Sequence, residues 1–507
     1  MTATGSARKA ALLAQDGLIL CCFLRALQVA GGGALSVEHA GNWSMLGFRT
    51  PQSRAAYSVI IRTLACRGWV ELDPVRQPEE PVNVHLTGAG HRASASWDNF
   101  ALVGEYLASF ASPDPDFWHA PWSESSQNMF DRLVPQLVNR WPSAGAPDAM
   151  IKANLDGALI IPLILSRARG AKVPEAAELV LRTTGWTPDA EARFGPTLGL
   201  SASYLPLLAE LPQTLVGTAS RHIRDDGSSY EWHVNRRLNV LACGTAHRRY
   251  FADAQVLVHE IFDRAPVRSQ PSFLADMGCG DGTWLLQLYA YIEGHTLRGQ
   301  HLDDYPLQVV GADLSATAAA VAKDRLSMLG VEPIVVAADV ADPSSFADVL
   351  ATHGLDIADG LHIRSFLDHD RDLRFRGSTE VGLVEPGMRV DISYLSGEGQ
   401  LVPAAVVKAD LVRHLRAWAR LVHRHGMLVI EAHAVPDALI GRHLGELHSL
   451  AFDAYHALSG QYPVDYETWL HCCVEAGLQI DGRLHRHYPS NEDYVAVSTH
   501  LFLGQGG

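Results

Sequence analysis

Apolar residues follow a helical period in the first third of the chain and gather into short runs in its second half. Residues 10–30 and 55–67 have apolar positions at helical spacing, which predicts two helices. Short apolar runs at 69–72 and 82–86, with prolines in the turn between them, are typical of two strands. Two helices followed by a hairpin predict a winged-helix-like domain over residues 1–95.

A winged-helix-like domain either reads DNA or serves as a dimerisation module or lid. The second helix carries only two cations, Arg62 and Arg67, and the whole chain has a formal net charge of −15. Both features argue against phosphate contacts. We therefore expect a dimerisation or lid role, with a homodimer as one arrangement, and no nucleic-acid partner.

Helical apolar patterns continue through residues 96–235, for example at 101–110 and 154–165, and no charge run or low-complexity linker interrupts them. They predict a helical connecting or lid region ahead of a further domain over 236–507. A chain of 507 residues is too long for one hydrophobic core, which agrees with two or three domains.

From residue 273 onward, apolar runs of strand length alternate with helical patterns. Such alternation is typical of a doubly wound, Rossmann-like α/β fold. Residues 477–503 carry two further strand patterns, which we expect to close the sheet antiparallel. The other expected strands are 273–277, 307–313, 333–337, 357–363 and 427–430, and the expected helices are 284–291, 316–329 and 409–425.

A glycine-rich turn, with Gly278, Gly280 and Gly282, follows the first of these strands. Glycines let the backbone approach a ligand closely, and the N–H groups of the following helix then face that ligand. The spacing Asp-x-Gly-x-Gly-x-Gly differs from the dinucleotide spacing Gly-x-Gly-x-x-Gly, which counts against a nicotinamide enzyme. By itself the turn also suits an ordinary strand-to-helix corner.

Three expected strands end at or next to a carboxylate: Asp276, Asp313 and Asp339. In a parallel doubly wound sheet the carboxyl ends of the strands meet at the edge where ligands bind. Asp313 is suited to accept both ribose hydroxyls of an adenosyl group, and Asp339 to accept from the adenine amino group. The three carboxylates make a sharper signal than the glycines alone.

Polar residues follow the fourth strand at Arg364, Asp368 and His369. An imidazole titrates near neutrality, so His369 is the natural general base, with Asp368 or Asp370 to orient it. A solvated polar loop is the alternative. Residues 383–402 predict a hairpin over this site.

Two histidines and a glutamine further along, His433, His456 and Gln461, are candidate ligands of a mononuclear metal such as Fe(II) or Mn(II). With 24 histidines in the chain, chance clustering is the alternative. The pair His247 and Tyr250, three residues apart, would lie on one helix face and either close over a ligand or pack against the sheet.

The composition adds expectations about the compartment. Hydrophobic residues make up 47% of the chain and charged residues 19%, as in a globular protein. The seven cysteines show no Cys-x-x-Cys spacing, which favours reduced thiols. Polar residues interrupt the apolar run at 10–30, so we expect no membrane span and a cytoplasmic location.

The turn Asp276–Gly282 resembles motif I of the class I S-adenosylmethionine (SAM) methyltransferases. A more specific resemblance, over roughly residues 150–500, is to the metal-dependent carbon methyltransferase domains of polyketide synthase loading modules, of the apratoxin starter type. The segments that carry it include Ala246-His247, Tyr250-Phe251, Arg298-Gly299, Tyr305-Pro306-Leu307, Gly311-Ala312-Asp313, Arg364–His369 and His456–Tyr462.

This resemblance implies a SAM-binding site, methylation of a malonyl-type carbon on a carrier protein, and a metal at His433, His456 and Gln461 that helps to form the enolate. The implied catalytic residues are His369, Arg364 and Asp368. The implied SAM-binding residues are Asp276, Gly278, Gly280, Asp281, Asp313, Leu314, Asp339, Val340 and Tyr250.

We therefore expect a SAM-dependent methyltransferase of natural-product (polyketide) biosynthesis that acts on an acidic carbon of a small or carrier-bound acyl substrate. One alternative is oxygen or sulfur methylation of a free small molecule. A second alternative, from another class, is a winged-helix regulator that responds to SAM.

Overall fold

The computed structural model describes residues 3–31, 50–72, 84–141, 148–219, 231–371, 373, 394–490 and 493–504. The chain divides into two compact units. Unit 1 comprises residues 1–246, 389–402 and 436–461, and unit 2 comprises residues 247–388, 403–435 and 462–507.

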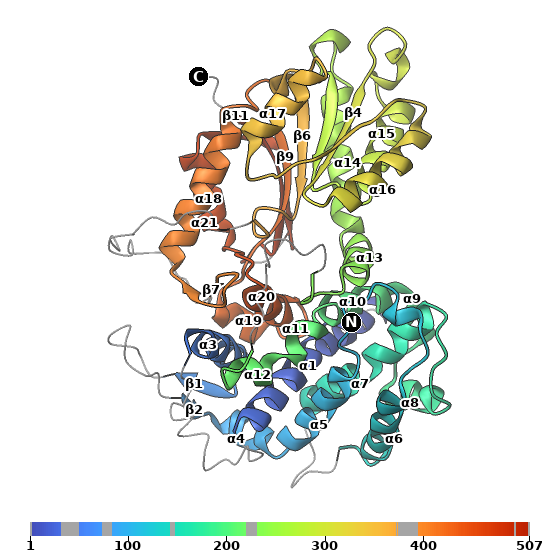
Figure 1. Ribbon diagram of the computed structural model, residues 1–507, viewed down its shortest axis with the longest axis vertical. Helices are drawn as coiled ribbons and strands as arrows, with labels where there is room; N and C mark the ends of the chain where they lie inside the picture. The colour runs from blue at the N-terminus through green and yellow to red at the C-terminus, as the bar shows by residue number, and fades with distance from the viewer. Residues whose placement is uncertain are drawn as a thin grey trace. The chain divides into compact units, whose positions relative to one another are not determined.

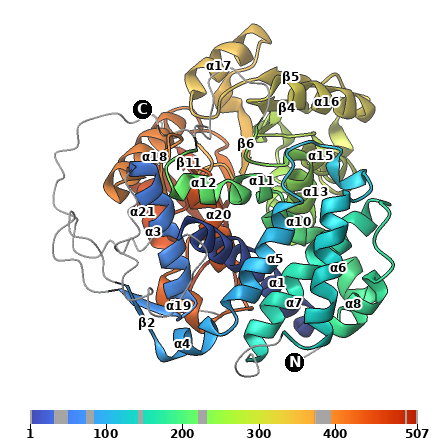
Figure 2. The same cartoon turned by 60° about the horizontal axis from the view of Figure 1, so that its bottom comes forward.

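Unit 1 is built around the long helix α1 (Ala3–Ala30), which packs against α5 (Trp97–Ala108) and α7 (Ala149–Ala168) (Figure 2). The remaining helices of at least four residues are α3 (Pro51–Cys66), α4 (Gly88–Ser94), α6 (Glu124–Val138), α8 (Ala177–Thr184), α9 (Pro188–Phe194), α10 (Gly199–Ala202), α11 (Leu205–Ala209), α12 (Leu211–Leu215), α13 (Arg236–Ala246), α19 (Asp437–Arg442) and α20 (Ser449–Leu458).

Glycines allow α1 and α7 to pack with their backbones in contact. A Cβ atom added to Gly17 would lie 2.0 Å from the carbonyl oxygen of Asn154, and one added to Gly157 would lie 2.5 Å from Cα of Ala14. Gly5–Ala30 and Ala149–Ala168 are apolar enough to cross a membrane by length and composition alone, yet 89% and 78% of them are buried inside the structure. Such burial is what core helices show, and the cytoplasmic location stays a prediction.

The predicted second helix and the two strands after it are present as α3, β1 (Val70–Leu72) and β2 (Val84–Leu86), and β1 pairs antiparallel with β2. Arg62 does not face solvent: its guanidinium lies 3.1 Å from Asp453 and 2.5 Å from Asp437. That burial strengthens the argument against a DNA-reading helix. The winged-helix assignment itself stays a prediction.

Unit 2 contains a seven-stranded sheet in the order β10-β11-β9-β6-β3-β4-β5 (Figure 1). The neighbours from β9 to β5 are parallel, and β11 is antiparallel to both β9 and β10. The predicted doubly wound fold with an antiparallel closure is therefore confirmed. The strands are β3 (Phe273–Met277), β4 (Gln308–Asp313), β5 (Ile334–Ala337), β6 (Gly360–Ser365), β9 (Met427–Ala432), β10 (Leu478–Tyr488) and β11 (Val497–Gly504).

Two sets of helices cover the sheet of unit 2. Within one set α15 packs on α14 and α16, and within the other α18 packs on α17 and α21 (Figure 1). The predicted helix 409–425 is wrong in its bounds, because the chain already becomes helical after Pro403 and leaves the helix at Arg420. The helices are α14 (Arg248–Phe262), α15 (Thr283–His295), α16 (Ala316–Leu326), α17 (Pro343–Thr352), α18 (Ala404–Ala419) and α21 (Tyr466–Glu475).

The predicted domain limits at residues 95 and 235 stay predictions. The first compact unit runs without interruption to Ala246 and also includes two later segments of the chain. Of the hairpin predicted over 383–402, the described part is β7 (Tyr394–Leu395) paired with β8 (Leu401–Val402), and both strands belong to unit 1. The rest of that prediction lies outside the described residues.

A cluster of histidines lies on one face of the sheet beside α21. The rings of His485, His487 and His500 have centroids 5.2–5.7 Å apart, and Tyr466 Oη lies 2.8 Å from His487 Nε2 and 3.2 Å from His500 Nε2. Burial, and then the neighbouring histidines, lower the pKa of His500 to about 3. The folded protein therefore holds His500 neutral.

This burial predicts an acid-dependent loss of stability. An unfolded histidine binds a proton below about pH 6.5, which the folded His500 cannot do, so its contribution is complete above that pH and falls as the pH decreases toward 3. Relative to His500→Phe, the wild type should lose about 2 kcal/mol of unfolding free energy between pH 7.5 and pH 5. Urea unfolding at both pH values measures this. An equal loss in both proteins would contradict the assignment.

Candidate active site

The carboxyl ends of the parallel strands form the candidate site of unit 2. The chain winds outward from β3 in two directions, through β4 and β5 on one side and through β6 and β9 on the other. In an open α/β sheet ligands bind in the crevice where the strand order reverses. The switch point lies between β3 and β6, and the loops after these two strands hold the glycine-rich turn and His369.

The glycine-rich turn follows β3 and takes a backbone path that favours glycine. Gly278, Gly280 and Gly282 have φ angles of +76°, +54° and +76°, which other residues rarely adopt. A Cβ atom on Gly278 would lie 2.8 Å from Cδ1 of Leu367 in the loop after β6. The turn therefore fits closely against that loop, and both lie at the same edge of the sheet.

Asp313 is fixed by the turn that it faces. Its two carboxylate oxygens accept hydrogen bonds of 2.9 Å from the N–H groups of Gly280 and Ser315. Burial, and then the negative charge of Asp313, raise the pKa of Asp276 to about 8. A carboxyl group whose ionisation is disfavoured by burial and by a neighbouring carboxylate suits a ligand that brings a positive charge.

The other predicted binding residues on this edge have structural partners as well. Asp281 forms an ion pair with Arg325, and its Oδ1 accepts from the N–H of Thr283 at 3.0 Å, where α15 begins. Asp339 accepts from the N–H of Ala341 at 2.8 Å. Val340 contributes its carbonyl to Trp418 Nε1 at 2.8 Å, while Leu314 is 68% exposed after β4.

An aromatic group borders the loop after β6. The His247 ring stacks on Phe366 with centroids 3.8 Å apart, and Tyr250 lies 6.1 Å from Phe366 and 4.7 Å from Tyr488. Phe366 has a φ of +60°, a backbone conformation that a bulky residue rarely holds outside functional sites. Tyr250 was predicted from the sequence as a site residue, whereas Phe366 was not. A positive φ at a phenylalanine cannot be predicted from the residue pattern.

His369 is oriented by a carboxylate from the neighbouring strand. Its Nδ1 hydrogen-bonds to Glu431 Oε1, and Glu431 also accepts from the N–H of Asp368 at 2.7 Å and from the N–H of Ala432 at 2.8 Å. Glu431 therefore orients His369 at Nδ1, and an orienting role for Asp368 or Asp370 stays a prediction. Glu431 was identifiable as the polar residue that interrupts the buried run of β9 at the same edge.

The same contact sets the basicity of His369. Burial alone would lower the pKa of His369, but the negative charge of Glu431 and the hydrogen bond to it raise the pKa above its ordinary value. Because Glu431 engages Nδ1, proton transfer at this imidazole falls to Nε2. Such an arrangement is suited to a general base that becomes an imidazolium next to a fixed carboxylate.

Arg364 and Asp368 lie in an internal ion network. Arg364 is fully buried, its guanidinium lies 2.7 Å from Asp368 Oδ1, and it donates to His414 Nε2 at 2.8 Å. Asp368 also accepts from Trp469 Nε1 at 2.9 Å. Although burial would raise the pKa of Asp368, Arg364 and His414 hold it below its usual range. The geometry shows that both residues support the loop that carries His369, and the catalytic role predicted for them from the sequence stays a prediction.

The three predicted metal ligands are distributed over both units, so each is described by itself. His433 Nε2 lies 2.8 Å from Ser498 Oγ, and its buried Nδ1 has no hydrogen-bond partner among the described residues. His456 Nδ1 donates to the Phe452 carbonyl at 2.7 Å, and Gln461 Nε2 donates to Tyr204 Oη at 3.0 Å. No group of three or more His, Cys, Asp or Glu in the described part of the chain has a metal-binding arrangement.

Comparison with known proteins identifies the family. The family model of the AprA MT2-like domain matches residues 231–500, while no curated protein matches significantly. Among solved structures, the chain resembles the CurJ carbon methyltransferase with 13% identity, covering 95% of this chain and 99% of that one at a TM-score of 0.37. It also resembles the DszA carbon methyltransferase with 12% identity, covering 82% and 92% at a TM-score of 0.38.

A third similar structure is an O-methyltransferase family protein from Burkholderia thailandensis, with 12% identity and a TM-score of 0.38, covering 68% of this chain and 87% of that one. These identities are too low to carry a substrate. The family match spans more than half of the chain and includes the glycine-rich turn, the strand-end carboxylates and His369. The protein is thus a class I SAM-dependent methyltransferase, a member of the AprA MT2-like methyltransferase domain family.

Proposed function

We propose that this enzyme methylates an acidic carbon of a small or carrier-bound acyl substrate in polyketide-type biosynthesis. The observation that carries the proposal is the buried His369–Glu431 pair at the carboxyl ends of β6 and β9. A carbon acid must lose a proton before it can accept a methyl group, and a base with a raised pKa is suited to remove it.

In this mechanism the loops of unit 2 hold the two reactants in line. Bound SAM supplies an electrophilic methyl group on a sulfonium. Asp313 would accept hydrogen bonds from the ribose hydroxyls, the turn Gly278–Gly282 would present backbone N–H groups, and Asp276 would face the positive charge of the cofactor. Tyr250 and Phe366 exclude water from the path of transfer.

His369 Nε2 then takes the proton of the acceptor carbon. The electron pair left on that carbon would form the new C–C bond to the methyl group while the methyl–sulfur bond breaks and leaves its electron pair on sulfur, and the proton would stay on the imidazolium next to Glu431. Arg364 and Asp368 hold the loop that carries His369. The same base would deprotonate a hydroxyl or thiol, so oxygen or sulfur methylation of a free small molecule is the alternative. Labelled SAM with a panel of carbon, oxygen and sulfur acceptors separates the two by mass spectrometry.

The proposal extends to a divalent metal, Fe(II) or Mn(II), on the strength of the family resemblance. The residue types suit such a metal. Burial lowers the pKa of His433 and so keeps its imidazole neutral. His456 Nδ1 and Gln461 Nε2 already donate hydrogen bonds, so His456 Nε2 and the amide oxygen of Gln461 are the atoms left to bind a metal. A bound divalent metal would stabilise negative charge on the substrate carbonyl.

Replacement of Asp313 should weaken SAM binding. Asp313→Ala removes a carboxylate acceptor that is already fixed by two backbone N–H groups, so the dissociation constant should rise by about tenfold or more in calorimetry. Asp304→Ala, which removes an exposed carboxylate from the turn before β4, serves as the control. Unchanged SAM affinity in a folded Asp313→Ala protein would rule out the assignment of Asp313.

The rate should depend on the protonation of His369. Only the neutral imidazole is a base, so kcat/KM should rise with pH through the raised pKa, and Glu431→Gln should shift that rise to lower pH while lowering kcat. His369→Gln should lower kcat by about 10²- to 10⁴-fold. The exposed His301→Gln is the control. Full activity of His369→Gln would refute the base assignment.

Metal analysis of the purified protein tests the metal. We expect a roughly stoichiometric divalent ion that is lost in His456→Ala and retained in His471→Ala, which alters an exposed histidine on α21. A metal-free protein with full methyltransferase activity would remove the metal from the proposal and leave the role of His369 intact.

A further inference from the structure

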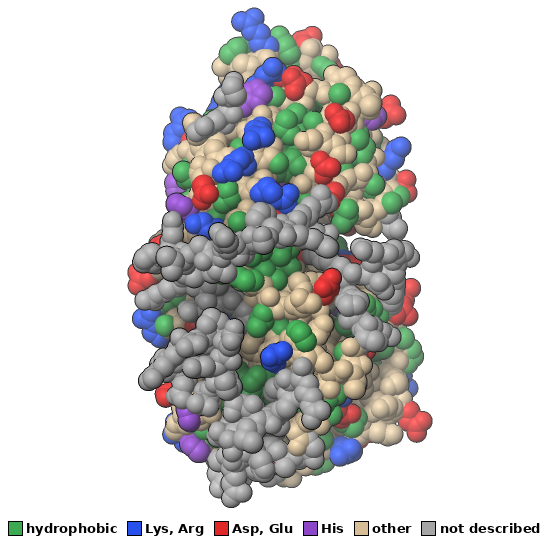
Figure 3. Space-filling model, turned by 60° about the vertical axis from the view of Figure 1, so that its left-hand side comes forward, with side chains coloured by type: hydrophobic (Ala, Val, Ile, Leu, Met, Phe, Trp, Pro, Cys, Tyr) green, Lys and Arg blue, Asp and Glu red, His purple; other side chains and the backbone are tan. Residues whose placement is uncertain are grey.

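Three histidines share one face of the sheet in unit 2. His485 of β10 is paired with His500 of β11, and His487 lies two residues further along β10, so the three side chains point to the same side. His500 is 2% exposed, while His485 and His487 are half-buried. On the face of the molecule drawn in Figure 3, histidine side chains are seen only at scattered points. The three imidazoles therefore form a cluster that lies largely inside the protein.

Helix α21 covers this cluster. The ring of Tyr466 stacks on His500 with centroids 5.8 Å apart, and its Oη lies within hydrogen-bonding distance of His487 and His500. The ring of Trp469, one turn further along the helix, lies 5.7 Å from His500. Because Tyr466 and Trp469 are on the same side of α21, the helix packs directly on the imidazoles.

The surroundings of the cluster hold no free counter-charge. The titratable and charged side chains that share this face of the sheet or this side of α21 are Glu431 and His433 of β9 and Tyr466 and Cys473 of α21. The Glu431 carboxylate is already bonded to His369 and to two N–H groups. Among the described residues, no carboxylate lies within 4.0 Å of the three imidazoles.

The charges of the two other helices near these strands are directed elsewhere. On α14, Asp253 accepts from Tyr488 Oη at 2.6 Å, and the side chain of Tyr488 lies on the opposite face of β10. On α18, the charged and titratable residues Asp410 and His414 bind Arg371 and Arg364. A proton taken up by the cluster would therefore have no partner to stabilise its charge.

Helix α21 and the residues before it also hold the loop that carries His369. Trp469 Nε1 donates to Asp368 Oδ2 at 2.9 Å, and the N–H of Tyr462 donates to the carbonyl of His369 at 2.7 Å. The same ring of Trp469 thus contacts the histidine cluster on one side and the catalytic loop on the other. If α21 moves away from the sheet, the loop loses one of its supports.

Protonation of the cluster opposes the packing of α21. Imidazolium rings with centroids 5.2–5.7 Å apart repel each other. Burial, and then the neighbouring histidines, lower the pKa of His500 to about 3 and also lower the pKa of His487. Rings released into water regain a pKa near 6.5, so the opened state binds more protons than the closed one below that pH. Acid therefore favours opening.

We propose that His485, His487 and His500 act as a pH switch, in which proton uptake in mild acid loosens α21 and with it the loop that carries His369. The consequence for catalysis rests on the proposed function and adds a means by which pH controls the same site. The switch is separate from the protonation of His369 itself, because it changes the position of the base and involves other imidazoles.

Hydrogen exchange of α21 in the full chain, followed by mass spectrometry at pH 7.5 and pH 5.5 and corrected for intrinsic rates, tests the switch. Between these pH values the opening of α21 should increase about tenfold or more in the wild type, the factor expected for His500 alone. His500→Phe keeps a ring against Tyr466 and Trp469 but binds no proton, so its increase should be about tenfold smaller.

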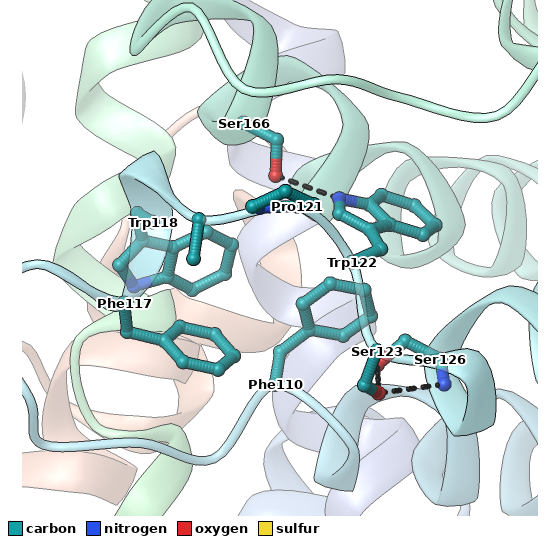
Figure 4. A pocket seen from close by; sticks show the side chains of 9 residues that line it. Phe110, Phe117, Trp118, Pro121, Trp122, Ser123, Ser126 and Ser166 are labelled. Carbon is teal, nitrogen blue, oxygen red and sulfur yellow. Dashed lines mark hydrogen bonds between the residues drawn. The ribbon is translucent and has the colours of Figure 1, made fainter.

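A second variant and a matched control accompany it. His487→Gln keeps a hydrogen-bond partner for Tyr466 at a half-buried position and should also reduce the increase. His471→Gln, at an exposed position of α21 itself, should behave as the wild type. The reference segments are β3 of unit 2 and α6 of unit 1, which borders an aromatic cavity lined by Phe110, Trp118 and Trp122 and by no histidine (Figure 4).

The same increase in the wild type and in both variants would overturn the switch. An equal increase in β3 or α6 would overturn it too, because the opening would then be global unfolding. Below pH 6.5 the kcat/KM of the wild type should fall more steeply than one proton allows, and His500→Phe should restore a slope of about one. A slope of one in both proteins would show that the opening does not reach the loop, and would overturn the switch.

These outcomes are distinguishable from a failure of the proposed function. Full activity of His369→Gln would remove the base assignment, whereas the exchange of α21 does not depend on methyl transfer and still decides whether the histidines control the helix.

Discussion

The site depends on one buried carboxylate at the end of β9. Glu431 accepts hydrogen bonds from His369 and from the N–H groups of Asp368 and Ala432, so a single side chain ties the loop after β6 to the neighbouring strand. A buried charge without such partners would be strongly unfavourable. The position of the base therefore depends on the loop, and the position of the loop depends on Glu431. The buried Arg364–Asp368 ion pair stabilises the same loop from the interior of unit 2.

Much of the cofactor half of the site follows from local sequence. The glycine turn, Asp313 and Asp339 are each adjacent to a strand end, and parallel strands bring their carboxyl ends together whatever the intervening helices contain. The residue that orients the general base could not be predicted from local sequence. Glu431 reaches His369 across β6 and β9, which are far apart in sequence, and the choice between Asp368, Asp370 and Glu431 depends on side-chain directions that periodicity does not specify.

Several charged residues that the sequence suggests for a functional surface are buried in ion pairs in the structure. Arg364 and Asp368 have the side chains of a catalytic pair, but they lie in the interior and form an ion pair with each other. Arg62, expected on a recognition helix, is likewise buried against two acidic residues of α19 and α20 in unit 1. Such ion pairs are formed by residues distant in sequence. The bounds of unit 1 were also unpredictable for that reason, because its α20 returns after residue 435 to pack on α3 and α1.

Phe366 shows a conflict between folding and activity. Its left-handed backbone disfavours the folded state by about 1–3 kcal/mol, which a glycine at the same position would largely recover. The aromatic ring, however, is what stacks on His247. Mutagenesis that selects for stability alone would therefore tend to replace Phe366 and so remove the ring that stacks on His247. Stability and function are in conflict at this one residue.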